Sequence, residues 1–200
     1  PRCFLSREVY LIIVLRNSSK TMDFQHKANI TKHTVPEFND DAQILVKTLR
    51  KLSKSDFLKV MKVSEKLADL NIERYAKWRS DLKSSDAKQA LVAFRGDIYS
   101  GMDVDNYKAK DFNCAQKHVR FLSGLYGILR PLDLMQPYRL EMATKLNTSR
   151  GKNMYQFWGN KINNSLKKML KQEKSGMLVN LCSLEYFKST QPNDLDARII

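Results

Sequence analysis

Two glycines in a dense polar segment are the first candidates for chemistry. Gly124 and Gly127 stand close together within residues 123–142, a segment that also carries two prolines and a series of charged residues. Glycine permits a positive φ or the close approach of a backbone, and exposed N–H groups at such a turn can hold phosphate oxygens. The alternative is structural, with one glycine ending a helix and the other opening a strand.

The charged residues that follow the glycines are Arg130, Asp133, Arg139 and Glu141. The two arginines would add positive charge to a phosphate-binding surface. Alternatively, each arginine pairs with the acidic residue that follows it. Together with Arg95 and Asp97, the same polar groups could instead line the site of an enzyme that performs acid/base or nuclease-like chemistry.

Two other polar groups follow predicted strands. Lys20 and Thr21 come after the first apolar run, where a lysine could face a cleft and contact phosphate, although a solvated lysine is the ordinary case there. Arg95, Asp97 and Tyr99 come after a later apolar run and could line the same cleft at the carboxyl edge of a sheet. The alternative for this second group is a turn with an internal arginine–aspartate pair.

Further basic and aromatic residues flank these segments. Five basic side chains would each add a phosphate contact without sequence information: Lys117, Arg120, Lys145, Arg150 and Lys152. Tyr126 and Tyr138 could line the cleft or stack on unpaired bases. Tyr155 and Trp158 lie on an apolar helical stripe, so we predict that they pack in the core.

The overall charge favours a polyanionic partner. The 35 lysines and arginines against 21 acidic residues give a formal charge of +14. Such a charge raises a positive potential over much of a domain of this size, although it can also serve solubility alone. We therefore expect DNA as a partner, and no membrane, because no apolar run approaches the length of a membrane span.

The cysteine and histidine pattern predicts neither a disulfide framework nor a metal site. Three widely spaced cysteines fit a reducing cytoplasm. Cys114 and His118 lie four residues apart and could share one helical face, but two ligands are too few for a specific metal site. We therefore predict no cofactor.

The elements that must position these residues alternate along the chain. Apolar runs predict strands at 9–15, 90–94, 125–129 and 177–181, with a further strand beginning at 197–200. Helical spacing predicts helices at 42–52, 57–61, 63–78, 111–124 and 155–169, the second of them capped by Ser53 or Ser55. This interleaving predicts one mixed α/β (α+β) domain over residues 1–200, with a central sheet and surrounding helices.

Four motifs carry a resemblance to a known family. The strings LVAFRGDIYSGM from residue 91, SGLYGILRPLDLMQPYRLEM from residue 123, GKNMYQFWGNKI from residue 151 and NLCSLEYFKS from residue 180 resemble the YaaA family. The resemblance runs from about residue 20 to residue 200. It implies a compact α/β fold with a positively charged cleft and a helix–hairpin–helix element, which best matches residues 114–131.

The resemblance also implies a function. It implies binding of duplex and branched DNA and protection during peroxide stress, with links to recombinational repair proteins and to limiting free iron. We therefore expect a DNA-binding protein that grips phosphates without reading sequence. The alternatives are an enzyme acting on nucleic acid or a nucleotide, and a protein that limits intracellular iron.

The sequence departs from the family pattern at both ends. The family's Ser-Pro-small-Lys-Thr motif would fall on residues 17–21, where Asn17 and Ser18 replace its first two residues. Residues 1–11 form an atypical extension, and the family continues beyond Ile200 with a basic segment. We therefore expect the N-terminal site to be altered and the C-terminal part of the family domain to be missing here.

Overall fold

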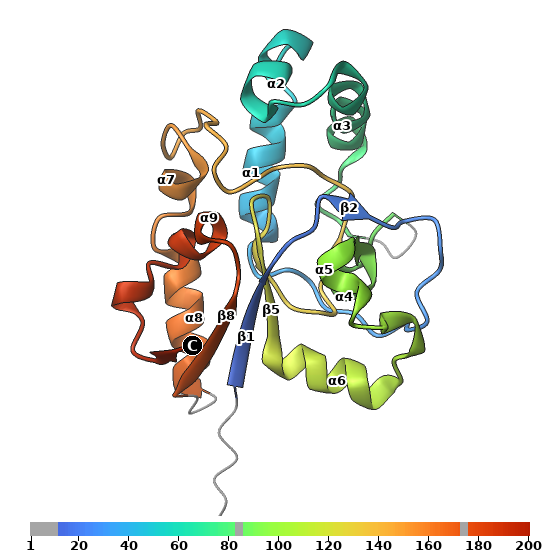
Figure 1. The fold of residues 1–200 in the computed structure, drawn as a ribbon. Coiled ribbons are helices and arrows are strands. Elements are labelled where there is room, and N and C mark those ends of the chain that lie inside the picture. Colours follow the sequence, from blue (N-terminus) through green and yellow to red (C-terminus); the bar gives the residue numbers. More distant parts are fainter. Residues whose placement is uncertain (1–11, 83–85, 173–175) are drawn as a thin grey trace, which may run out of the picture.

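The centre of the computed structural model, which describes residues 12–82, 86–172 and 176–200, is a sheet built from distant parts of the chain. Strand β1 (Ile12–Asn17) lies between β5 (Val119–Ser123) and β8 (Met177–Leu181) and runs parallel to both (Figure 1). In the described part of the chain the order is β6-β5-β1-β8-β9. The mixed α/β fold with a central sheet is therefore confirmed, while residues 1–11 lie outside the described residues.

The two outer strands of this sheet are short. β6 (Gly127–Leu129) pairs antiparallel with β5, and β9 (Arg198–Ile199) pairs parallel with β8. Two small antiparallel pairs lie outside the main sheet: β2 (Thr21–Met22) with β4 (Phe94–Arg95), and β3 (Lys88–Gln89) with β7 (Leu134–Met135). The first pair attaches the segment after β1 to β4, and the second joins residues 88–89 to residues 134–135.

A helical layer lies beyond the carboxyl ends of the parallel strands. It consists of α1 (Asn39–Leu49), α2 (Lys54–Met61) and α3 (Glu65–Lys77), at the top of Figure 1. The helical spacing at Ala42, Leu45 and Leu49 is confirmed, because these side chains are buried. Ser53 caps α2 as predicted, since its side chain accepts a hydrogen bond from the backbone N–H of Asp56.

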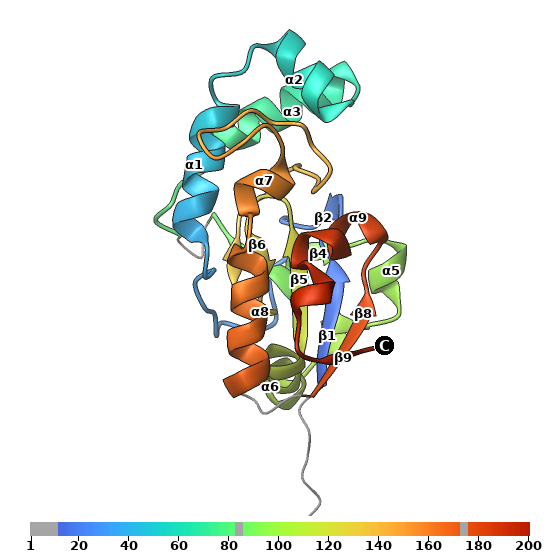
Figure 2. The ribbon, with the colours of Figure 1, turned by 90° about the vertical axis from the view of Figure 1, so that its left-hand side faces the viewer.

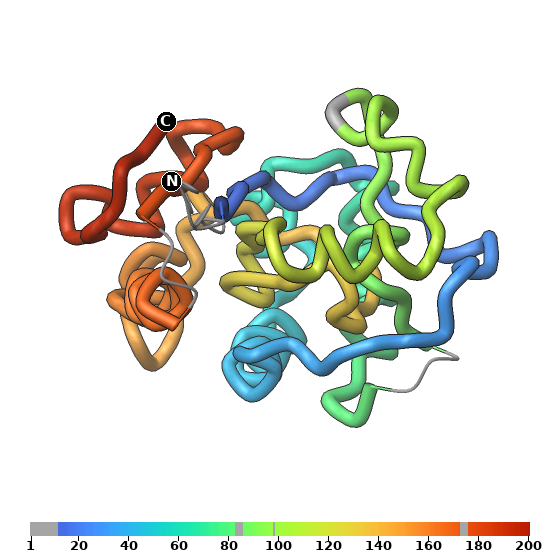
Figure 3. The backbone as a smooth tube through the Cα atoms, turned by 90° about the horizontal axis from the view of Figure 1, so that it is seen from below, coloured from blue at the N-terminus to red at the C-terminus, as the bar shows by residue number. Residues whose placement is uncertain are grey.

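Two longer helices support the sheet in different directions. In Figure 1, α8 (Lys161–Gln172) runs along the strands, whereas α6 (Ala109–His118) crosses them at the end where β1 begins. Figure 2 shows α8 beside β6, and Figure 3 shows α8 end-on with α6 lengthwise. α8 contacts β6, and α6 contacts β1 and β5. No helix in the described part of the chain is long and apolar enough to cross a membrane.

Short helices complete the connections. They are α4 (Ala90–Ala93), α5 (Asp97–Ser100), α7 (Met154–Trp158) and α9 (Leu184–Phe187). Three turns of 3-10 helix lie at η1 (Val104–Asn106), η2 (Lys188–Thr190) and η3 (Pro192–Asp194). α9 packs on β5 and on η2, so the chain after β8 folds back over the sheet.

The predicted helix–hairpin–helix element is not confirmed. Helix α6 ends at His118 instead of continuing to Gly124, and residues 119–129 form the β-hairpin β5–β6. The sequence showed no stop signal at His118, and its helical spacing continues through Val119 and Leu122. Pairing of β5 with β1 decides the structure, because it satisfies the backbone groups that a longer helix would satisfy internally.

Two other predicted elements were wrong in type or length. The apolar run at 90–94 forms the short helix α4 followed by β4, not one strand. A run of this length cannot be assigned by periodicity, since a buried helix and a buried strand look alike. The predicted helix at 155–169 is divided into α7 and α8 at Gly159, whose φ is +47°.

An ion-pair group joins α1 to α8. The Asp41 carboxylate, in the first turn of α1, accepts hydrogen bonds from Arg150 and from Lys161, whose Nζ lies 2.8 Å from Oδ1. Burial raises the pKa of Asp41, but the hydrogen bonds and charges of these two cations outweigh it and hold the pKa below its usual range. Asp41 is therefore ionised at neutral pH.

We expect Asp41→Asn to lower the free energy of unfolding by about 2 kcal/mol at neutral pH, because two charge-assisted hydrogen bonds are weakened. A carboxylate whose pKa is lowered by folding stabilises the fold above its unfolded pKa, and this stabilisation is lost as the pH falls through its folded pKa. In urea unfolding at a series of pH values, the difference from wild type should therefore shrink below about pH 4. Asp40→Asn, at an exposed neighbouring carboxylate, is the control and should change little.

Candidate functional site

The carboxyl edge formed by the parallel strands β1, β5 and β8 brings several predicted polar residues together. β1, β5 and β8 all end at this edge, and the chain leaves β1 toward β5 but leaves β8 toward β9 on the other side. Such a change of direction opens a crevice between neighbouring strands in α/β sheets. The segment directly after β1 contains Ser18, Ser19 and Lys20.

Hydrogen bonds tie the ends of these strands together. Asn17 and Ser183 exchange two bonds, in which the Asn17 side chain donates to Ser183 Oγ and accepts from the Ser183 backbone N–H, each at 3.2 Å. The backbone N–H of Ser18 donates to the carbonyl oxygen of Leu122 at 2.8 Å. These hydrogen bonds fix the backbone at Asn17 and Ser18, and so they position Lys20 two residues further on.

Lys20 meets two other predicted residues at this edge. Its Nζ lies 3.1 Å from Glu141 Oε1, and Nη2 of Arg139 donates to the same oxygen at 3.2 Å. Lys20 is 60% exposed and Glu141 30% exposed, so one shared carboxylate faces two cations at the surface. The predicted pairing of Arg139 with Glu141 is confirmed, but Lys20 competes for the same acid.

A close backbone approach holds the segment that carries Arg139 and Glu141. A Cβ at Gly124 would lie 2.2 Å from the carbonyl oxygen of Leu140, so only glycine lets this segment pack against the end of β5. Tyr138 and Ser123 share a hydrogen bond of 2.6 Å, and Tyr75 Oη donates to the Arg139 carbonyl at 2.7 Å. Gly124 is therefore required for packing.

Gly124 and Gly127 do not offer exposed amides to a phosphate. Residues 121–129 are all buried, and a Cβ at Gly127 would meet the Trp158 ring at 2.8 Å. Tyr126 is completely buried as well, and its hydroxyl accepts from Trp78 Nε1 and from the backbone N–H of Gln136. Gly124, Gly127 and Tyr126 are therefore part of the core and do not belong to a phosphate-binding surface.

Three buried tyrosines contact the residues at the ends of β1 and β5. Tyr138 and Tyr99 are at most 4% exposed, and Tyr186 is 8% exposed. Burial raises the pKa of Tyr138 to about 12. Tyr138 therefore remains a neutral hydrogen-bonding group, and its ring is too deeply buried to stack on bases. Tyr99 hydrogen-bonds to the Asn17 carbonyl oxygen, so it supports β1 and does not line an open cleft.

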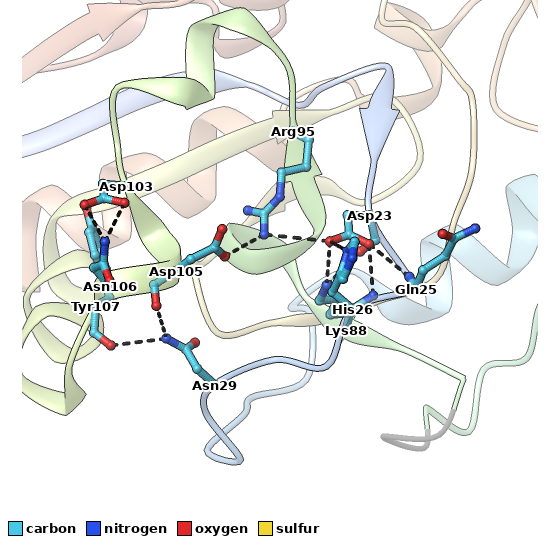
Figure 4. Close-up of polar contacts among 10 residues, drawn as sticks. All are labelled: Asp23, Gln25, His26, Asn29, Lys88, Arg95, Asp103, Asp105, Asn106 and Tyr107. Atoms are coloured by element: carbon cyan, nitrogen blue, oxygen red, sulfur yellow. Dashed lines mark hydrogen bonds and ion pairs between the residues drawn. The ribbon is translucent and has the colours of Figure 1, made fainter.

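A pocket of about 610 Å³ lies beside this edge, and its residues come from separate segments. The β2–β4 pair places Thr21 opposite Arg95, and Thr21 is exposed. Figure 4 shows the Arg95 guanidinium between two carboxylates, Asp105 at 2.8 Å and Asp23 at 3.8 Å. Asp97 is exposed, and the carboxylate partners of Arg95 are Asp23 and Asp105, so the alternative of an internal arginine–aspartate pair in this turn does not hold.

The Asp23 carboxylate has the largest number of polar partners among the carboxylates of this pocket. Burial raises its pKa, but hydrogen bonds from the backbone and ring of His26 and from the backbone of Gln25, with the charge of Lys88, hold the pKa of Asp23 well below its usual range. Lys88 Nζ donates to the Asp23 carbonyl oxygen at 2.9 Å, and its side chain is only 7% exposed. Asp23 thus remains ionised, with a buried lysine behind it.

The outer strand β6 and helix α8 carry a second group of predicted residues. A groove of about 370 Å³ between α8 and β6 is lined by Arg120, Arg130 and Lys168, with Asp133 and Glu37 as its acids. Arg130 donates two bonds to Asp133 through Nε and Nη2, at 3.0 and 2.8 Å, which confirms their predicted pairing. Asp133 is 1% exposed, so it belongs to the floor of the groove.

The other predicted basic residues lie apart from both groups or on open surface. Arg150 is held by Asp41, and its guanidinium lies over the Phe157 ring. Lys117, Lys145 and Lys152 are exposed. The predicted site residues therefore do not form one cleft: Lys20, Arg95 and Arg139 belong to the carboxyl edge, and Arg120 and Arg130 to the α8 groove.

The polar residues that could line an enzyme's site are separated in the same way. Asp133 lies in the floor of the α8 groove, whereas Arg139 and Glu141 lie at the carboxyl edge beyond β5. In the described part of the chain, no three His, Cys, Asp or Glu side chains form a group that could hold a metal ion. Cys114 is exposed, and His118 hydrogen-bonds to the carbonyl oxygen of Ile12.

Sequence reasoning missed several residues of the pocket and the groove. They are Asp23, His26, Asn29, Lys88, Asp105 and Lys168. Asp23, His26 and Asn29 lie in a segment without periodicity, and Lys88 precedes a run that was predicted as a strand. The sequence of α8 did contain a signal for a basic surface, because it has no acidic residue and its lysines recur at helical spacing.

The fold and these sites define an α/β protein with polar and basic side chains at the carboxyl ends of its central parallel strands. Comparison with known sequences identifies the family. The sequence profile of peroxide stress protein YaaA matches residues 11–200, so the chain belongs to this family and the resemblance is confirmed. The chain is also similar to a UPF0246 protein of Shewanella sediminis (strain HAW-EB3), with 47% identity over 189 residues, which are 94% of this chain and 74% of that protein.

Proposed function

We propose that this member of the peroxide stress family binds DNA through phosphate contacts on a basic face formed by α8 and the groove beside it. The observation that carries the proposal is the sequence of α8, which contains four lysines and no acidic residue. Lys167, Lys168 and Lys171 are exposed, and their spacing places them on one side of the helix.

The packing of α8 explains why these lysines face outward. Ile162, Leu166 and Leu170 are buried on the opposite side of the helix. The groove beside Lys168 adds Arg130, which is 40% exposed, whereas Arg120 is buried. Of the groove's two acids, Asp133 is bound by Arg130 and Glu37 accepts a hydrogen bond from Ser165. The face therefore has a surplus of positive charge within reach of a polyanion.

Phosphate contacts of this kind make binding depend strongly on salt. Each contact contributes roughly 0.9 to the slope of log K against log salt concentration for duplex DNA. We expect K167Q/K168Q/K171Q to reduce the slope by about 3 and to weaken binding to unrelated duplexes alike. Fluorescence anisotropy over a salt series would measure both quantities.

A second triple variant separates a local face from net charge. K51Q/K59Q/K66Q removes the same charge from exposed lysines around α2 and α3, away from α8. This control should leave most of the salt slope in place. Equal losses in the two variants would mean that net charge alone is responsible, and binding that does not depend on salt would overturn the proposal.

A further inference from the structure

We propose that the pocket around Arg95 is a separate binding site for a small phosphorylated ligand, whose phosphate takes the place of Asp105 at the Arg95 guanidinium. The pocket of about 610 Å³ is lined by Asp23, His26, Lys27, Asn29, Arg95 and Asp105. Its volume lies within the range of about 300–1,000 Å³ that small-molecule sites occupy.

Arg95 has donors that its two carboxylate partners do not use. Both carboxylate contacts of its guanidinium use Nη2, and among the described residues Nε and Nη1 have no hydrogen-bond partner. The side chain is 28% exposed, so a ligand can reach it. A guanidinium with free donors in a fixed fork binds a phosphate in two parallel hydrogen bonds.

The two carboxylates beside Arg95 differ in how firmly they are held. Asp23 is 15% exposed and is bound by backbone N–H groups of Gln25 and His26 and by Lys88. Asp105 is 78% exposed, and in the described structure Arg95 is the one partner of its carboxylate. An exposed ion pair contributes about 0–1 kcal/mol, so an incoming phosphate can displace Asp105 but not Asp23.

The remaining lining residues suit the same ligand. Lys27 is exposed, and the His26 ring is 84% exposed with Nδ1 bound to Asp23 at 3.0 Å. This bond leaves His26 Nε2 directed away from Asp23. Because Lys88 balances the charge of Asp23, displacement of Asp105 leaves Arg95 and Lys27 in excess around the pocket.

Calorimetric titration with inorganic phosphate and with a nucleoside monophosphate tests the site. We expect Arg95→Gln to weaken both by at least about tenfold, since a charge-assisted bidentate contact is lost. We expect Asp105→Asn to tighten both, because it removes the competing anion while keeping the side-chain shape. Arg79→Gln and Asp81→Asn, which change a similar surface pair elsewhere, should have little effect.

The opposite responses of the two pocket variants make the test decisive. Absence of binding to wild type, a loss in Asp105→Asn, or an equal gain in Asp81→Asn would overturn the proposal. Duplex binding distinguishes the source of the phosphate: Arg95→Gln should leave it intact, and the α8 triple variant should leave phosphate binding intact. If Arg95→Gln weakens duplex and phosphate binding alike, the pocket holds a nucleic-acid phosphate and the small-ligand proposal is overturned, whatever the outcome at α8.

Discussion

Replacing Asp133 by alanine is expected to lower the free energy of unfolding by about 2–3 kcal/mol, because the hydrogen-bond donors that meet this buried carboxylate lose their acceptor. The Asp133 carboxylate accepts four hydrogen bonds, two from the Arg130 guanidinium, one from the Arg130 backbone N–H and one from Thr34 Oγ1. It is 1% exposed in the floor of the α8 groove, so these hydrogen bonds are shielded from water. The loss would be a large fraction of the stability of a typical domain.

Two further substitutions show whether burial is the cause. Asp133→Asn retains one acceptor oxygen and should cost less than the alanine variant. Asp69→Ala removes a carboxylate that pairs with Lys54 at the surface, where the expected cost is about 0–1 kcal/mol. Urea unfolding followed by circular dichroism would measure all three. A loss in Asp133→Ala no larger than that in Asp69→Ala would contradict the interpretation.

The second large effect is expected at Gly124, where alanine should destabilise the protein by about 3 kcal/mol, toward the upper end of the usual cost of overpacking. The atoms that a Cβ would meet belong to the backbone, the Leu140 carbonyl oxygen at 2.2 Å and the Glu141 carbonyl carbon at 3.1 Å. No rotamer change relieves such a clash. The segment that carries Arg139 and Glu141 must move, so the ion pairs with Lys20 should be disturbed as well.

Gly101 supplies a matched control for this substitution. A Cβ at Gly101 would meet no atom within 4 Å, and its backbone has φ −73° and ψ −4°, which alanine adopts readily. Gly101→Ala should therefore be neutral or stabilise the protein by up to about 1 kcal/mol. Thermal unfolding of both variants tests the comparison, and equal midpoints for the two would refute the close approach at Gly124.

The two candidate sites are physically separate, which makes their functions separable. The α8 groove lies where β6 ends, whereas the Arg95 pocket depends on segments that follow β1 and β4. Each contains an arginine that is bound by an aspartate, but only the Arg95–Asp105 pair is exposed enough to exchange its anion. One chain could thus bind a nucleic acid on one face and a small phosphorylated compound on another.

Local interactions were predictable from the sequence because they join residues that are close along the chain. The cap of α2 at Ser53 and the pairings of Arg130 with Asp133 and Arg139 with Glu141 all span at most three residues. The strand cores at β1 and β8 were predictable for a similar reason, since a short apolar run between polar segments reports burial.

Contacts between distant segments were not predictable. Asp23 meets Lys88 and Arg95 through strand pairs that local patterns do not specify. The sequence pattern at Gly124 and Gly127 suggested exposed backbone amides, but both glycines are buried. These glycines are needed because other parts of the chain pack against them, and that packing buries the amides that a phosphate would need.

The sequence by itself determined the α/β class, the basic character and the family of this protein. These properties depend on composition, periodicity and motif order, all of which are present before the chain folds. Only the tertiary structure decided which cations share a surface, because electrostatic partners are selected by distance in space. It divided one predicted cleft into the α8 groove and the Arg95 pocket, and it placed Lys20 and Arg139 on one carboxylate at the carboxyl edge.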